Sequence, residues 1–270
     1  MLNFFKSLFR DIKNNYLGIS YPFGKQIVAT KEFYLKKFEE VKNLKYENID
    51  NFLPVKKYPI EKNWIDNLAL HTQIVKKKSQ INYQHGRILY SCLKEYILSN
   101  QHKYIEILEI GTARGFSSLC MSKSIMDCNI RGNIFTIDII PHNKAFFWNC
   151  IDDHEKPKTR EELLLKWYEQ LQNIRFVTGP SRFALKKLNL NRINFAFIDG
   201  MHDFSNVKRE FNFVSLRQKK NDIIIFDDVS DNFPEVIKLI KYIKKLNTYQ
   251  IQTLASGIDR SYAICTKLND

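Results

Sequence analysis

The chain has 270 residues, of which 44% are hydrophobic and 13% aromatic. This supply of apolar side chains excludes a wholly disordered chain, and the length excludes a small scaffold that depends on disulfides. The formal net charge of +13 raises the potential seen by anionic partners, whether phosphorylated small molecules, nucleic acid or acidic lipid.

The five cysteines include no C-x-x-C pair, so the sequence indicates neither a disulfide framework nor a cysteine zinc site. A cytoplasmic protein is therefore the simplest expectation. No apolar run reaches the roughly 18 to 20 residues of a membrane-spanning helix. The lysines come in short, scattered groups without the arginine-rich arm or aromatic-basic repeat of nucleic-acid modules, so we expect no specific nucleic-acid partner.

Residues 1–15 predict an amphipathic helix, with apolar side chains at helical spacing on one side and basic side chains on the other. Such a helix can dock on its own domain or on a second subunit, which would give a homo-oligomer. It can also lie on an acidic membrane surface, here the inner face of the membrane. We favour docking. Residues 1–83 as a whole are expected to form a helical N-terminal appendage.

From residue 84 onward, short β-rich runs alternate with helical patterns. The β-rich runs are 104–110, 133–139, 174–178, 193–198, 222–226, 249–254 and 261–266. The helical patterns between and after the first five are 117–126, 161–171, 182–188, 207–216 and 233–246. This alternation predicts an α/β fold: a Rossmann-like, doubly wound, mostly parallel seven-stranded sheet. The short link between the last two strands predicts an antiparallel terminal hairpin. Residues 84–270 would form this domain.

The first β-rich run leads into residues 109–117, which have the pattern E-x-G-x-x-x-G-x-S. Two glycines here let the backbone turn tightly and pass close to a ligand before a helix N-terminus. The pattern resembles motif I of class I S-adenosylmethionine-dependent methyltransferases. The resemblance implies S-adenosylmethionine as the cofactor, with contacts from Glu109, Gly111, Thr112, Ala113, Gly115 and Ser117.

Asp138 ends the second run roughly 20 residues beyond the glycine turn, where an acidic side chain can accept both hydroxyls of an adenosine ribose. The alternative is a turn-forming residue ahead of Pro141. Residues 179–181 follow the third run, where the resembling family wraps the adenine, so Ser181 is a further expected contact. Pro180 stands at a place that is often acidic in that family.

Three carboxylates, Asp199, Asp227 and Asp228, follow the fourth and fifth runs. At adjacent strand ends they would repel one another, so something cationic is expected between them. Oxygen ligands with vacancies for water and substrate suit Mg²⁺ or another divalent cation. The alternative is that Asp227 or Asp228 caps a turn while Asp199 pairs with a lysine. We favour the metal.

The phrases F-I-D-G-x-H and D-D-V, which contain these aspartates, resemble those of metal-dependent small-molecule O-methyltransferases, including sugar-modifying members. The resemblance implies that Asp199, Asp227 and Asp228 bind the metal and that Asp199 also contacts the cofactor. Met201 departs from the pattern, because sugar-modifying members often have an aspartate there. His202 is the nearest replacement as a base. Capping the next helix or orienting an aspartate is the equally weighted alternative for it.

The predicted function is methyl transfer from S-adenosylmethionine to a hydroxyl of a small molecule, with divalent-metal assistance and with Asp199 and His202 as catalytic residues. A sugar or sugar conjugate, as in polysaccharide biosynthesis, is the expected acceptor, and a phosphate on it would suit the positive charge. The alternatives are an RNA or protein methyltransferase, or a non-catalytic binding protein on the same fold. The aromatic connection 141–159 is either a substrate lid or a packing insertion.

Overall fold

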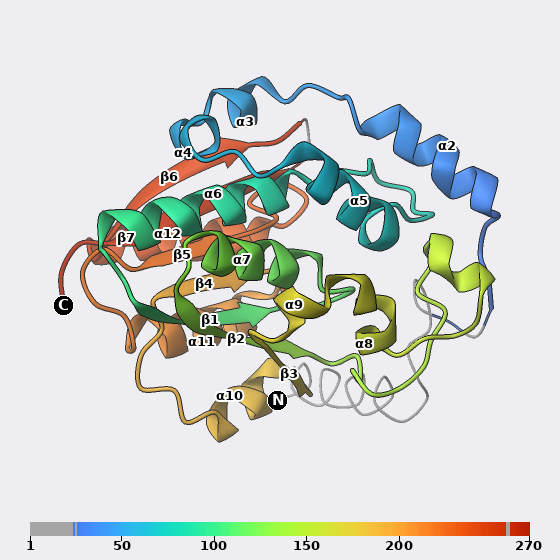
Figure 1. Cartoon of the computed structure of the whole chain (residues 1–270). Coiled ribbons are helices and arrows are strands. Elements are labelled where there is room, and N and C mark those ends of the chain that lie inside the picture. Colours follow the sequence, from blue (N-terminus) through green and yellow to red (C-terminus); the bar gives the residue numbers. More distant parts are fainter. Residues whose placement is uncertain (1–23, 25, 258–259) are drawn as a thin grey trace.

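The computed structural model describes residues 24, 26–257 and 260–270 (Figure 1). Its centre is a seven-stranded sheet. The strands are β1 (Tyr104–Ile110), β2 (Arg131–Asp138), β3 (Ile174–Thr178), β4 (Phe195–Ile198), β5 (Ile223–Phe226), β6 (Tyr249–Ala255) and β7 (Ser261–Lys267). Every strand falls on one of the β-rich runs, and β1 and β3 have the predicted ends.

The strand order is β3-β2-β1-β4-β5-β7-β6. Strands β1 to β5 are parallel, whereas β7 runs antiparallel to both β5 and β6. After β1, the chain forms β2 and β3 on one side of β1 and then forms β4 and β5 on its other side. This reversal beside β1 is where doubly wound sheets open a ligand crevice. The predicted fold class, including the antiparallel terminal hairpin, is confirmed.

Helices cover both faces of the sheet (Figure 1). One face carries α6 (Gln84–Ser99) and α7 (Phe116–Asp127), and the other carries α10 (Ser181–Lys187), α11 (Phe204–Ser215) and α12 (Pro234–Leu246). Successive side chains of β1 divide between the two layers: Ile105 and Ile107 pack on the α6 side, and Leu108 and Ile110 on the α11 side. The pleat produces this alternation, and both faces are apolar because both are covered.

The described part of the expected N-terminal appendage is helical. It consists of α2 (Lys31–Val41), α3 (Glu47–Asn51), α4 (Leu53–Lys57) and α5 (Lys62–Thr72). Helix α4 packs against α6, and α5 packs against α7. The buried side chains of Tyr34, Ile49 and Leu68 belong to the same hydrophobic cluster as Ile107 of β1. The appendage therefore shares its core with the sheet domain.

The connection between β2 and β3 is a packed insertion. It contains η1 (Ile151–His154), α8 (Arg160–Leu163), η2 (Leu165–Trp167) and α9 (Tyr168–Leu171), so the single helix predicted for 161–171 is broken. A 3₁₀ turn aligns side chains three residues apart, and here it buries both Leu164 and Trp167. Phe146 and Trp148 are buried in the core. This burial supports the packing alternative for the aromatic connection rather than the lid.

Asn149 joins the appendage to this insertion. Its side chain accepts hydrogen bonds from the Tyr34 hydroxyl at 3.1 Å and the Lys76 backbone N–H at 3.0 Å, and it donates to the Lys76 carbonyl at 2.9 Å. Asn149 is buried, with φ of 55° in the left-handed region that asparagine tolerates better than most residues. One side chain thus fixes three polar groups of the appendage.

We predict that Asn149→Ala lowers the free energy of unfolding by about 3 kcal/mol, because buried polar groups lose their partners. Urea denaturation followed by tryptophan fluorescence measures the loss. Asn133→Ala is the control, since it removes only an exposed hydrogen bond to the Tyr104 hydroxyl. We expect it to cost under about 1 kcal/mol. Equal losses in the two variants would contradict the account.

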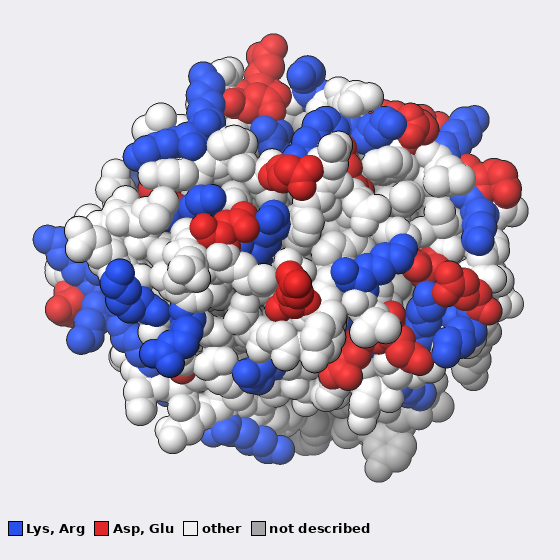
Figure 2. All heavy atoms as spheres, viewed as in Figure 1, with Lys and Arg blue, Asp and Glu red and all other residues white. Residues whose placement is uncertain are grey.

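Positive and negative side chains are intermixed over the face shown in Figure 2, with Lys and Arg separated by Asp and Glu. In the described part of the chain, no helix has both the length and the apolar character needed to cross a bilayer. The amphipathic helix expected for residues 1–15 lies outside the described residues. Its docking and membrane alternatives stay predictions.

Candidate active site

The candidate active site lies at the carboxyl ends of β1, β2, β4 and β5. The last residue of β1, Ile110, pairs with Ile137 of β2 on one side and Ile198 of β4 on the other. The glycine turn after β1 therefore lies between Asp138 and Asp199. Most of the residues that the sequence singled out meet at this edge.

Two glycines are required by the backbone of the turn after β1. Gly111 has φ of 101°, and a Cβ there would lie 1.9 Å from the Asp199 carbonyl oxygen. Gly115 has φ of 88° and precedes α7, and its Cβ would lie 2.5 Å from a methyl group of Leu164. Side chains at these positions would clash and adopt an unfavourable φ. The turn thus runs directly against the end of β4.

Asp138 closes the other side of the turn. Its carboxylate accepts hydrogen bonds from the backbone N–H groups of Ala113, at 2.6 Å, and Ile140, at 2.9 Å. Arg160 of the insertion lies 3.7 Å from the same carboxylate and donates to the Ala113 carbonyl at 2.8 Å. Burial raises the pKa of Asp138, and the charge of Arg160 opposes this rise. Arg160, which the sequence gave no reason to select, therefore holds the carboxylate and the turn together.

Glu109 lies beneath the turn. It is fully buried and accepts hydrogen bonds from the hydroxyls of Ser118 and, at 2.5 Å, Thr136. Burial raises its pKa, while hydrogen bonds from Ser117, Ser118 and Thr136 oppose the rise. The Thr112 hydroxyl lies 2.5 Å from that of Thr136 and extends this network. The structure thus places Glu109 as an anchor between β1, β2 and α7.

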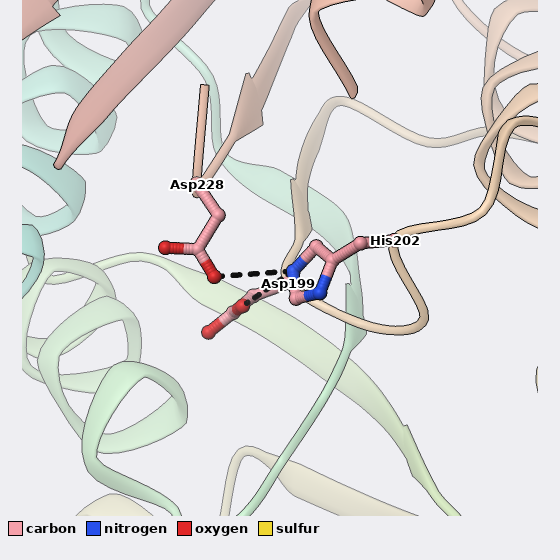
Figure 3. Close-up of side chains that lie close together, drawn as sticks. All are labelled: Asp199, His202 and Asp228. Atoms are coloured by element: carbon pink, nitrogen blue, oxygen red, sulfur yellow. Dashed lines mark ion pairs between the residues drawn. The ribbon is translucent and has the colours of Figure 1, made fainter. Parts of the chain in front are cut away.

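Asp199, His202 and Asp228 point toward one another at the ends of β4 and β5 (Figure 3). His202 Nε2 lies 3.1 Å from an Asp228 oxygen and 3.8 Å from an Asp199 oxygen. Within the described residues, these three form the group that could hold a metal ion, with ligand atoms all within 4.8 Å of one another. Asp203, rather than His202, caps α11. Of the roles left open for His202, capping is therefore excluded, and the geometry favours orienting an aspartate.

Asp227 does not belong to this group, because Arg260 binds it. Arg260 Nε donates to Asp227 Oδ1 at 2.9 Å, and Nη2 donates to Oδ2. The Asp228 backbone N–H also donates to Oδ1, at 2.7 Å. The group in the structure is thus Asp199, His202 and Asp228, whereas the sequence predicted Asp199, Asp227 and Asp228 as metal ligands; that metal site stays a prediction.

The charges in the site shift one another's pKa values. Burial and the charge of Asp227 raise the pKa of Asp199. Burial acts in the same direction on Asp227, but Arg260 outweighs it and lowers the pKa. Burial lowers the pKa of His202, but its pairing with Asp199 and Asp228 outweighs burial and raises the value to about 10. A protonated imidazole donates and cannot accept a proton. Asp199 is therefore the better general base of the two expected catalytic residues.

Ser181 begins α10 and donates a hydrogen bond to Glu210 of α11 at 2.5 Å. Glu210 is buried, and its carboxylate oxygens lie 3.7 and 3.8 Å from the place where a Cβ on Gly200 would lie. Burial raises its pKa to about 7. Sequence reasoning missed Glu210, because an acidic residue on an amphipathic helix is usually solvent-facing.

We predict that Glu210→Gln removes a pH-dependent loss of stability. The raised pKa means that the folded state binds this proton more tightly than the unfolded state, whose value is near 4.5. The stability of the wild type relative to the variant should therefore fall by on the order of 2 kcal/mol as the pH rises from about 4.5 to 7. Urea denaturation at a series of pH values measures the difference.

Glu235→Gln is the matched control for this experiment, because the Glu235 side chain is 47% exposed on the neighbouring helix α12. Its stability curve should run parallel to that of the wild type. If the stability curve of Glu210→Gln also ran parallel to that of the wild type, Glu210 would not be a buried carboxyl group with a raised pKa.

Comparison with known proteins agrees with this geometry. Residues 108–229 match the model of a family described as a methyltransferase domain. This segment is similar to that family, and the chain has the fold of class I methyltransferases. The matched segment runs from β1 to just beyond Asp228 and thus contains the glycine turn and all three aspartates. The resemblance read from the sequence motifs is confirmed. No curated protein sequence matches the chain.

Solved methyltransferase structures share the fold at low sequence identity. A cofactor-bound protein from MTB is 16% identical, with a TM-score of 0.57 over 84% of this chain and 100% of that one. The O-methyltransferase from Bacillus cereus, in complex with SAH, is 16% identical, with a TM-score of 0.52 over 86% and 96% of the two chains. The O-methyltransferase TomG from Streptomyces achromogenes, in complex with SAM, is 12% identical, with a TM-score of 0.53 over 80% and 94%.

Proposed function

We propose that the protein is an S-adenosylmethionine-dependent O-methyltransferase that acts on a hydroxyl of a small molecule. The observation that carries this proposal is the juxtaposition at one sheet edge of a backbone cradle and an acid–base group. The cradle is the turn of Gly111 to Gly115 closed by Asp138, and the acid–base group is Asp199 with His202. Two of the solved structures with this fold are named O-methyltransferases, which supports the same reading.

The cradle suits the cofactor. The turn has glycine at positions 111 and 115, where φ is positive, and the Asp138 carboxylate is fixed beside it. Asp138 would bind the ribose hydroxyls, the turn would face the amino-acid end, and Ser181 would lie at the adenine. When bound, the sulfonium supplies an electrophilic methyl group. Glu109 and Arg160 act on the cofactor through the turn that they hold.

The acid–base group suits a hydroxyl acceptor. A hydroxyl, unlike an amine, must lose its proton as its oxygen bonds to the methyl carbon and the C–S bond breaks. Asp199 is placed to accept that proton, since burial and Asp227 raise its pKa toward the working range. His202 holds Asp199 and Asp228 in place and presents positive charge where negative charge develops on the oxygen.

The predicted Mg²⁺ site of three aspartates does not fit the residues as they stand. Mg²⁺ prefers oxygen ligands in octahedral geometry. Asp227, one of the three expected ligands, has both carboxylate oxygens bound by Arg260, and the remaining group includes an imidazole nitrogen. We therefore derive the proton transfer from Asp199 and His202, with no step that requires a metal.

The proposed acceptor is a sugar or sugar conjugate of the kind used in polysaccharide assembly. The motifs around Asp199 and Asp228 resemble those of sugar-modifying O-methyltransferases, and the net charge of +13 would favour an acceptor that carries phosphate. Nucleoside diphosphate sugars combine both features. They form the first panel to assay, with S-adenosylhomocysteine release as the readout.

We predict that Asp138→Ala weakens S-adenosylmethionine binding at least tenfold, about 1.4 kcal/mol, because the ribose loses its acceptor. Isothermal titration calorimetry measures the affinity, and Asn133→Ala, toward the amino end of β2 and away from Asp138, should leave it unchanged. Circular dichroism checks that the variant is folded. Unchanged affinity in folded Asp138→Ala, or no binding by the wild type, would refute the cofactor assignment.

A further inference from the structure

The site contains three neighbouring carboxylates, which need positively charged or hydrogen-bonding partners. Asp199 follows β4, and Asp227 and Asp228 follow β5, its parallel neighbour. Asp227 is fully buried, and the other two are only partly exposed. Buried like charges at this spacing repel, so positive charge or hydrogen-bond donors must accompany them.

Arg260 meets Asp227 from the strand on the far side of β5. Strand β7 pairs antiparallel with β5, with Phe226 opposite Ala263, and the Val229 N–H donates to the Ser261 carbonyl at 2.9 Å. This register places the residue before β7, Arg260, beside the end of β5. Its third nitrogen donates to the Asn82 carbonyl at 2.9 Å. The guanidinium is therefore held from two directions.

The geometry of this pair leaves Asp227 little capacity for another partner. Arg260 contacts both of its oxygens in the two-pronged arrangement that matches guanidinium to carboxylate. The Asp228 N–H takes a second position on Oδ1. A metal ion at Asp227 would have to compete with this arginine, whose side chain is 21% exposed.

His202 performs the corresponding role for the other two carboxylates. It reaches Asp228 and Asp199 from the loop after β4, with Nε2 between them (Figure 3). All three carboxylates thus have a partner that belongs to the chain itself. The His202 imidazole nitrogen therefore already lies near both Asp199 and Asp228.

We propose that Arg260, together with His202, takes the place of a divalent cation in this site, so that the protein binds its cofactor and transfers methyl groups without a metal. Arg260 neutralises Asp227 and thereby allows Asp199 and Asp228 to be arranged around His202. It is a positioning residue, because it acts through Asp227 rather than on the acceptor. The catalytic part of this inference rests on the proposed function, whereas the metal-binding part does not.

The first test measures metal binding by the full-length protein. Thermal melting in EDTA, Mg²⁺ or Mn²⁺ should give wild-type transitions within about 1 °C of one another, and native mass spectrometry should show no bound divalent ion. Arg260→Gln frees Asp227 and should melt at lower temperature in EDTA. Mg²⁺ or Mn²⁺ should then raise its transition by about 3 °C or more.

The chain offers a matched control. Arg192 binds Asp222 through the same two-pronged contact at the opposite end of β5. Arg192→Gln should also lower the melting temperature but should produce no metal response, since no metal-holding group among the described residues includes Asp222. If Arg260→Gln alone fails to fold, Arg260→Gln with Asp227→Asn removes the unpaired charge. The melting temperature of that double variant should lie closer to that of the wild type and should not change when Mg²⁺ or Mn²⁺ is added.

Two results would overturn the inference. The first is that Mg²⁺ or Mn²⁺ raises the melting temperature of the wild type and that the Asp228→Asn variant loses this response. The second is that the Arg260→Gln variant folds but shows no metal response, which would mean that Arg260 does not occupy the place of a cation. Cofactor affinity measured in EDTA separates this question from the proposed function. Tight binding in EDTA with metal-dependent turnover would refute only the metal-free inference.

Discussion

The mutual repulsion of the carboxylates at the ends of β4 and β5 is the constraint on which the site depends. Parallel neighbouring strands bring Asp199, Asp227 and Asp228 to one edge, and Asp227 is buried there away from water. Arg260 from the terminal hairpin and His202 from the loop after β4 lie beside these carboxylates. The antiparallel hairpin is therefore part of the site, because its register delivers the arginine.

The same edge carries the cofactor cradle, and one backbone contact links the two. The Cα of Gly111 is so close to the Asp199 carbonyl that no side chain fits between them. The turn after β1 therefore packs directly against the backbone of the acid–base group after β4. Arg160 and Glu109 brace the turn from either side, through the insertion and the buried hydroxyl network. This coupling would hold a transferable methyl group and its acceptor in a fixed relation.

Much of this arrangement could be predicted from the sequence, because it depends on local patterns. The β-rich runs fixed strand positions, and strand-end motifs brought Asp138, Asp199 and Asp228 to the correct edge. What failed depends on contacts distant in sequence. Asp227 pairs with a residue 33 positions later, and only the hairpin register shows that Arg260 reaches it. Glu210 looked solvent-facing until its helix was placed against Ser181. Residues 161–171 have a helical pattern, but in the structure a 3₁₀ turn with buried Trp167 divides the helix.

The central claim is that side chains of this protein, rather than a metal, organise its strand-end carboxylates. A crystal structure with S-adenosylhomocysteine, grown from protein exposed to Mn²⁺, tests it most directly through the anomalous signal of manganese. The account predicts Arg260 on Asp227, His202 between Asp199 and Asp228, and no anomalous peak at the site. A manganese peak within bonding distance of Asp199, Asp227 and Asp228, with Arg260 displaced, would contradict it.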